Sequence, residues 1–237
     1  MEVKLLWFVM ACGAAFLAAY IAKCCKKRSV SGIFIKSLVS VFYLITGAVA
    51  ILVAPQNYIY GLLIIIGGVF GLLGDIFLDQ KYTHLDYKDT YLTMGFASFG
   101  IGHLFYIVAI WKFAGLELKD IWLPVLTATA IPAVNLFLPK LFGQDFGKFK
   151  GIATLYAVVL SFTVGSAIMA FIKTGFTGYL MFAVAGVSFL ASDLVLSAMY
   201  FTVTKDKNTP ARFIINIVTY YLAQYLIAAS AAFIEAV

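Results

Sequence analysis

Eight apolar runs of about 18–24 residues, separated by short polar segments, constrain this chain more than any other feature. Each run is long enough to cross a bilayer as an α-helix, because a spanning helix needs about 20 apolar residues. The runs are too long, and alternate too little, to be strands of a membrane barrel. The expected spans are Leu5–Ala22, Ile33–Val53, Tyr60–Leu78, Tyr91–Phe113, Ile121–Leu138, Ile152–Ile172, Gly178–Phe201 and Phe213–Phe233.

The composition also indicates a polytopic membrane protein of the all-α class. Of the 237 residues, 63% are hydrophobic and 12% are charged, whereas about a quarter of a soluble domain is usually charged. The segments between the spans are too short for a separate soluble domain, so we expect a single eight-helix transmembrane domain over residues 1–237. The net charge of +6 does not indicate a nucleic-acid partner, because the basic residues lie mostly between apolar runs.

The basic residues divide unevenly between the two sides of the membrane. Cytoplasmic loops carry an excess of Lys and Arg, and 13 of the 17 basic residues lie in or beside the loops that follow odd-numbered spans. We therefore predict an integral protein of the cell (inner) membrane with both termini outside. The 13 residues are Lys23, Lys26, Lys27, Arg28, Lys36, Lys81, Lys88, Lys140, Lys148, Lys150, Lys205, Lys207 and Arg212.

Four ionisable side chains interrupt the apolar spans or mark their ends. Asp75 lies inside the third span and Asp79 at its end, while His103 lies deep in the fourth and Asp193 in the seventh. Ionisable groups are costly in lipid, so each is a functional-site hypothesis, although each could instead bond a neighbouring helix. In the predicted orientation they fall in the cytoplasmic half of the membrane or near mid-depth, which indicates one shared site.

Polar side chains of other spans are expected to complete this site. Lys36 enters the second span from the cytoplasmic side, where it can snorkel to the headgroups or bind a lipid phosphate. Tyr220 and Gln224 are four residues apart and share a helical face, from which they can bind substrate or join helices. The other candidates for substrate contact are Asp79, Tyr106, Tyr156, Ser192 and Tyr221.

The small number of histidines argues against a zinc hydrolase site. The chain has His103 and, in a polar loop, His84, which is too few for a histidine-rich zinc site. Two aspartates with His103 could still hold another metal, and that alternative stays open. The sequence lacks a nucleophile elbow, a phosphate loop and a dinucleotide fingerprint. We therefore expect neither a metal nor another cofactor.

Five short blocks of sequence, taken in their order along the chain, resemble those of a known family of membrane proteins. Together they resemble the YhhN family of membrane proteins, whose animal members include lysoplasmalogenase. The resemblance covers nearly the whole chain, with the same number of spans. In the shortest block, Ser37 stands where family members often carry proline. The blocks are IKSL at Ile35–Leu38, GDIFL at Gly74–Leu78, GHLFY at Gly102–Tyr106, FLASDL at Phe189–Leu194 and TYYLAQ at Thr219–Gln224.

The resemblance implies hydrolysis of the vinyl ether bond of a lysoplasmalogen, such as lysoplasmenylethanolamine or lysoplasmenylcholine. The products are a fatty aldehyde and a glycerophospho-base. Protonation of the β-carbon starts this cleavage, and water then adds to the resulting cation. A protonated and an ionised carboxyl group can supply the acid and the stabilising charge. The implied catalytic residues are Asp75 and Asp193, with His103 as a third candidate, and the substrate would come from membrane lipids and the water from the cytoplasm.

Two other functions remain possible from the sequence. A proton-coupled transporter of small solutes or lipids would use buried carboxyl groups as proton relays. Such a transporter predicts helices broken near mid-depth, and only the segment with Pro124 and Pro132 suggests one. A lipid-binding membrane protein without turnover is the third possibility.

Overall fold

The computed structural model describes residues 2–24, 30–81, 84–203 and 209–234, and these residues fold into eight α-helices with short 3₁₀ turns. Lys26, Lys27, Arg28, Lys205 and Lys207, which contributed to the predicted orientation, lie outside the described residues. The helices are α1 (Glu2–Cys24), α2 (Val30–Val53), α3 (Tyr58–Gln80), α4 (Lys88–Phe113), α5 (Trp122–Phe142), α6 (Lys150–Thr174), α7 (Thr177–Phe201) and α8 (Pro210–Ser230).

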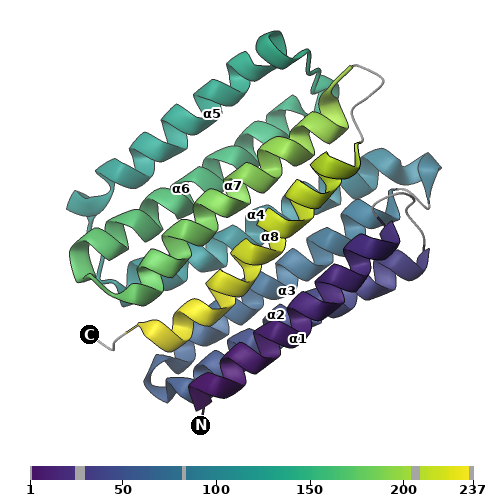
Figure 1. Ribbon diagram of the computed structural model, residues 1–237. Coiled ribbons are helices and arrows are strands. Elements are labelled where there is room, and N and C mark those ends of the chain that lie inside the picture. Colours follow the sequence, from purple (N-terminus) through teal and green to yellow (C-terminus); the bar gives the residue numbers. More distant parts are fainter. Residues whose placement is uncertain (1, 25–29, 82–83, 204–208, 235–237) are drawn as a thin grey trace.

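The helices run side by side along one axis and reverse direction at each connection (Figure 1). The first three helices form one side of the bundle, α5 lies at the opposite edge against α6, and α8 lies between these groups. The start of α1 and the end of α8 lie at the same end of the bundle. The carboxyl end of α3 and the amino ends of α2, α6 and α8 consequently meet at the other end.

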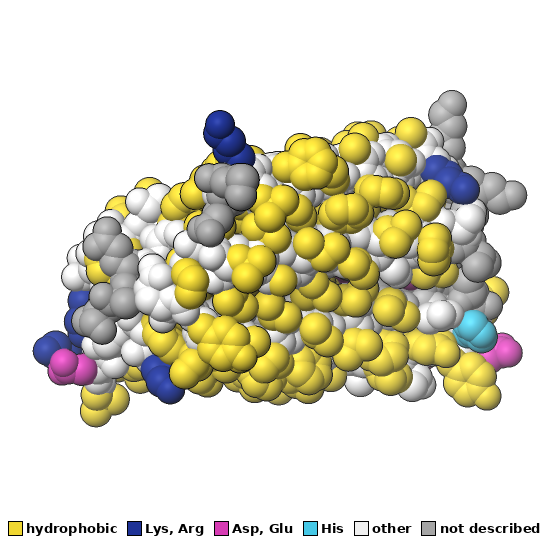
Figure 2. All heavy atoms as spheres, turned by 90° about the horizontal axis from the view of Figure 1, so that it is seen from below, with side chains coloured by type: hydrophobic (Ala, Val, Ile, Leu, Met, Phe, Trp, Pro, Cys, Tyr) yellow, Lys and Arg dark blue, Asp and Glu magenta, His cyan; other side chains and the backbone are white. Residues whose placement is uncertain are grey.

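The surface between the two ends is apolar, as a lipid-facing surface must be. Figure 2 shows a broad band of hydrophobic side chains, with charged side chains gathered mainly at the two ends. Within the described residues, seven helices are long and apolar enough to cross a membrane, and α5 is the helix outside that set. The prediction of an all-α polytopic membrane bundle is therefore confirmed.

Glycines allow α3 and α4 to pack with their backbones in close contact. A Cβ added to Gly102 would lie 2.7 Å from the carbonyl oxygen of Gly67, and one added to Gly74 would lie 2.7 Å from the Phe99 ring. Small residues permit such close approach between helices in lipid. The backbones of α3 and α4 therefore lie close together at these positions. Gly71, however, faces α8 and α2, because its added Cβ would meet the side chain of Gln224 at 2.7 Å.

The fifth helix differs from the sequence prediction at its carboxyl end. It continues to Phe142, and α6 begins at Lys150, so the connection between the two expected spans, residues 139–151, shortens to residues 143–149. This connection is tied to the end of α7, since Asp145 N donates to the Phe201 carbonyl at 2.8 Å. The helix is also continuous through Pro132, so it does not supply the broken helix that a transporter would require.

Candidate active site

Lys36, Asp75 and Asp79 form a buried cluster of one cation and two carboxyl groups between α2 and α3. The Lys36 Nζ lies 3.1 Å from Asp75 Oδ1 and 3.2 Å from Asp79 Oδ2. The three residues are only 6%, 4% and 7% exposed, respectively. The spacing of the two aspartates explains how one lysine meets both, because residues four apart share a helical face. The sequence predicted all three residues as site candidates but did not predict that Lys36 would bridge the two carboxyl groups.

Three donors contact the carboxyl group of Asp75. Its Oδ1 meets Lys36, while its Oδ2 accepts hydrogen bonds from Ser40 Oγ at 2.9 Å and from Tyr220 OH at 2.8 Å. An ionised carboxylate is an acceptor only, and it suits a position surrounded by three donors. The geometry therefore fits Asp75 as a fixed negative charge inside the membrane region.

A chain of polar side chains holds Tyr220 in place against Asp75. Gln224 Nε2 donates to the Tyr220 hydroxyl at 3.0 Å, and Tyr106 OH donates to Gln224 Oε1 at 3.4 Å. Tyr221 acts separately: its hydroxyl donates to the Lys36 carbonyl at 3.1 Å and lies 3.0 Å from Ser40 Oγ. Tyr220 of α8 thus contacts Asp75 directly. Gln224 of α8 and Tyr106 of α4 support Tyr220 from the next positions of the chain of hydrogen bonds.

A cavity of about 560 Å³ adjoins this cluster. Its polar lining includes Lys36, Asp75, Asp79, Tyr220 and Asp193, so the walls of one cavity carry acidic groups of both α3 and α7. The lining residues Asp145, Gly147 and Lys150 are exposed. They place the opening at the α5–α6 connection, beside the carboxyl end of α3. Large apolar side chains complete the walls, including Leu78, Leu92, Phe96, Phe99, Leu160 and Leu190.

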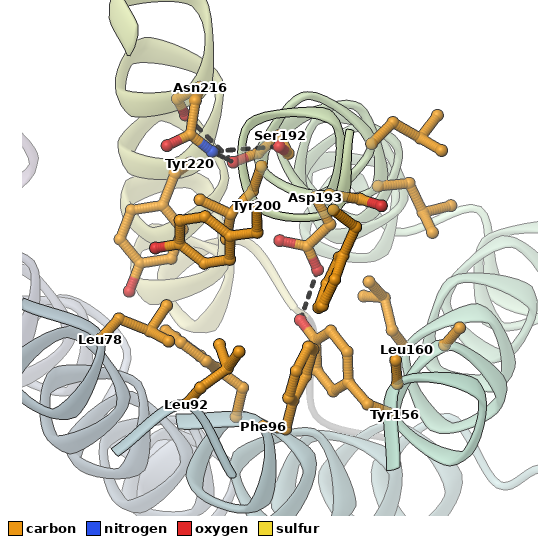
Figure 3. Close-up of a pocket in the computed structure, with 18 of the residues that line it drawn as sticks. Leu78, Leu92, Phe96, Tyr156, Leu160, Ser192, Asp193, Tyr200, Asn216 and Tyr220 are labelled. Carbon is orange, nitrogen blue, oxygen red and sulfur yellow. Dashed lines mark hydrogen bonds between the residues drawn. The ribbon is translucent and has the colours of Figure 1, made fainter. Parts of the chain in front are cut away.

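Asp193 lies on a different wall from Asp75 and has a simpler environment. Its Oδ2 accepts a hydrogen bond from Tyr156 OH at 2.5 Å, and Tyr156 is its sole hydrogen-bond partner among the described residues. Figure 3 shows Asp193 and Tyr156 joined across the gap between α7 and α6. The second carboxyl oxygen of Asp193 points away from Tyr156 and into the cavity, towards the side where Tyr200 and Tyr220 lie.

His103 does not line the cavity that Asp75 and Asp193 share, although the sequence analysis expected all three in one site. The ring is 2% exposed and is absent from the cavity lining within the described residues. It packs edge-on against Phe189 at a centroid distance of 4.9 Å and lies 6.1 Å from Tyr156. Neither ring nitrogen has a hydrogen-bond partner among the described residues. His103 therefore packs behind Tyr156, which lines the cavity, and does not face the cavity itself.

Ser192 joins α7 to α8 rather than pointing freely into the cavity. Its Oγ donates to the Asn216 carbonyl at 3.0 Å, and Asn216 Nδ2 donates to Ser192 Oγ at 2.8 Å and to the Ser192 carbonyl at 3.0 Å. Figure 3 shows this pair at the cavity wall next to Asp193. The reciprocal bonds fix the rotation of α7, and hence the direction in which the next residue, Asp193, projects.

The described residues contain no group of three or more His, Cys, Asp or Glu side chains placed to hold a metal ion. Asp75, Asp193 and His103, which the sequence left open as metal ligands, point to different surroundings: Asp75 to Lys36, Asp193 to Tyr156 and His103 to Phe189.

A comparison with known protein families identifies the family of this chain. The family model of YhhN matches residues 31–231, which include every residue of the site described above. The chain belongs to the YhhN family. Lysoplasmalogenases are among the members of this family. Neither the search of curated proteins nor that of solved structures found a match.

In this YhhN protein, the sequence blocks that carried the resemblance come together in space. Gly74–Leu78 supplies Asp75, Phe189–Leu194 supplies Asp193, and Thr219–Gln224 supplies the tyrosine and glutamine that hold Asp75. Sequence reasoning missed Ser40, although its position one turn after Lys36 places it on the same face of α2. It also treated Lys150 only as a topology signal, whereas Lys150 lines the opening of the cavity.

Proposed function

We propose that this protein is an intramembrane hydrolase that cleaves the vinyl ether bond of a lysoplasmalogen, releasing a fatty aldehyde and a glycerophospho-base. The observation that carries the proposal is the single cavity whose largely apolar walls contain two acidic groups, Asp75 and Asp193, in different environments. A cavity of about 560 Å³ lies within the range of small-molecule sites, about 300–1,000 Å³. Membership of a family that includes lysoplasmalogenases supports the same substrate class.

Asp193 is assigned the role of general acid. One of its oxygens is held by Tyr156, and the other is directed into the cavity, where it can carry a proton to a bound substrate. Asp75 is less suited to that role because Lys36, Ser40 and Tyr220 already occupy both of its oxygens. Because the two carboxyl groups have different surroundings, Asp193 can hold a proton as the acid while Asp75 stays ionised.

The reaction begins when the Asp193 proton moves to the β-carbon of the vinyl ether, and the electron pair of the double bond forms the new C–H bond. The ether oxygen shares the resulting positive charge as an oxocarbenium ion, which the negative charge of Asp75 stabilises. A negative group near such a cation has the same purpose in glycosidases. Water then adds to the cationic carbon and returns a proton to Asp193. The hemiacetal collapses to the aldehyde and the free hydroxyl of the glycerophospho-base.

The cavity suits a lipid that carries one long chain. The chain would lie against the apolar walls formed by Leu92, Phe96, Leu160 and Leu190. Leu194 lines the cavity and is also 47% exposed on the outer face of α7, where lipid is expected. The exposed residues of the α5–α6 connection give water a path from the opposite direction.

The direct test is aldehyde release from a synthetic lysoplasmenylethanolamine by the purified protein in detergent micelles. We expect release that scales with protein concentration, because the proposed acid acts on the vinyl ether itself. The matched control is the saturated 1-O-alkyl lysophospholipid of the same chain length, which has no double bond to protonate. If an excess of folded protein releases no aldehyde, or acts equally on both lipids, the proposal is wrong.

We further propose that the cavity opens on the cytoplasmic side and that both termini lie outside. The support is the excess of Lys and Arg at the end of the bundle where the cavity opens. A C-terminal fusion to a reporter that is active only outside the cytoplasm should therefore be active, while the same reporter inserted after Phe142 should be silent. The opposite pattern would reverse the orientation without changing the site.

A further inference from the structure

The phosphate of the proposed substrate needs a cation, and Lys36 is poorly placed to supply it. Lys36 Nζ already lies 3.1 Å from Asp75 and 3.2 Å from Asp79. A phosphate bound to Lys36 would lie a few ångströms from both carboxyl groups, and like charges at that distance repel strongly in a low-dielectric site. The charge of Lys36 is already balanced, so it is unsuited to an additional anion.

Among the described residues that line the cavity, Lys150 is the one other basic residue. It is exposed at the opening, in the first turn of α6, and it forms no ion pair with a described carboxylate. Its neighbour Lys148 differs, because it pairs with Asp89 outside the cavity. Asp145 is also near the opening, where its carboxylate accepts the N–H of Gly147 at 2.8 Å and, within the described part of the chain, forms no ion pair with Lys150. Lys150 therefore presents an available positive charge at the entrance.

The position of Lys150 along α6 matches the length of the substrate. Tyr156, which holds Asp193, follows six residues later, and six residues of α-helix rise about 9 Å. In a lysoplasmalogen, about seven bonds separate the phosphorus from the β-carbon, which is roughly 8 Å in an extended chain. Ala153 and Ala157 line the cavity on the same face of α6, and their small side chains leave room for the glycerol backbone between these two points.

We propose that Lys150 binds the phosphate of the lysophospholipid headgroup and so sets the depth at which the vinyl ether meets Asp193. This inference rests on the substrate class proposed above. Lys150 is a binding residue that determines specificity for phosphate-bearing lipids. It takes no part in the proton transfer.

The test measures binding without turnover. The probes are a 1-O-alkyl lysophosphatidylethanolamine, which lacks the vinyl ether, and the 1-O-alkylglycerol of the same chain length, which lacks the phosphate. We expect Lys150→Gln to raise the Kd of the phospholipid about tenfold, the usual value of one charge-assisted contact, and to leave that of the alkylglycerol unchanged. Lys148→Gln is the matched control, since it removes a nearby charge outside the cavity, and it should change neither Kd.

Two results with the lipid probes would overturn the inference. One is an unchanged Kd for the phospholipid in Lys150→Gln, and the other is an equal loss for both probes, which would indicate a general disturbance of the cavity. Inorganic phosphate distinguishes a lipid site from a free-phosphate site: binding of phosphate alone, as tight as that of the phospholipid and dependent on Lys150, would reject the lipid assignment. Because no turnover is needed, failure of the aldehyde assay with this Kd pattern intact would reject only the proposed hydrolysis.

Discussion

Asp193→Asn should lower the turnover of a lysoplasmalogen by about 10²–10⁴-fold, because it removes the proposed general acid. Asparagine keeps the shape of the side chain and can still accept a hydrogen bond from Tyr156, but it has no acidic proton to transfer to carbon. The loss corresponds to about 3–5 kcal/mol of activation barrier. The measurement is the initial rate of aldehyde release under saturating substrate, with thermal unfolding of each variant recorded alongside.

Asp86→Asn is the matched control for that variant. Asp86 is an exposed carboxylate in the 3₁₀ turn before α4, away from the cavity lining, so the same substitution there should leave the rate unchanged. The wild-type enzyme should also show a solvent deuterium isotope effect, because proton transfer to carbon is slow. A rate above about one tenth of wild type in Asp193→Asn would assign the acid to another group, and Asp75 would be the first to consider.

The sequence could predict the main features of the fold because lipid imposes a simple rule. A spanning segment must be long, apolar and helical, so the runs from Leu5 to Phe233 located the helices to within a few residues. The rule was weaker at α5, where helix continued past Pro139 to Phe142. Proline disfavours a helix interior without excluding it, and contacts between the following connection and α7 supply structure that the sequence pattern does not record.

For the site, the sequence predicted which residues take part better than it predicted how their side chains are directed. Asp75 and Asp193 stood out because an acidic group in an apolar span is rare and costly. The direction of each side chain was harder to predict, since a helix that is apolar on all sides gives no signal for which face meets which neighbour. His103 was therefore expected in the same site as Asp75, yet its ring lies against Phe189. Ser40 escaped notice because a serine in a spanning helix usually bonds its own backbone, as its 3.3 Å contact with the Lys36 carbonyl also does.

The second large effect that we expect concerns stability, and it follows from the buried ion-pair cluster on α2 and α3. Lys36→Met should reduce the free energy of unfolding by about 3–5 kcal/mol, the usual cost of removing one partner from a buried ion pair. The lost cation leaves Asp75 and Asp79 facing each other without a counter-charge in a site where they are 4% and 7% exposed. Thermal unfolding in detergent should show a decrease in Tm of roughly 10 °C for a chain of this size.

A compensating variant separates lost charge balance from lost packing. In the triple variant Lys36→Met, Asp75→Asn and Asp79→Asn, no ionised group remains in the cluster, and neutral replacements of similar size often restore stability. We expect most of the lost Tm to return while turnover stays absent, because the negative charge that stabilises the oxocarbenium ion is gone. Lys119→Met is the control, since its pair with Glu117 is largely exposed and such pairs contribute about 0–1 kcal/mol. If the triple variant is no more stable than Lys36→Met, the loss comes from the packing of the lysine stem, and the cluster contributes to catalysis alone.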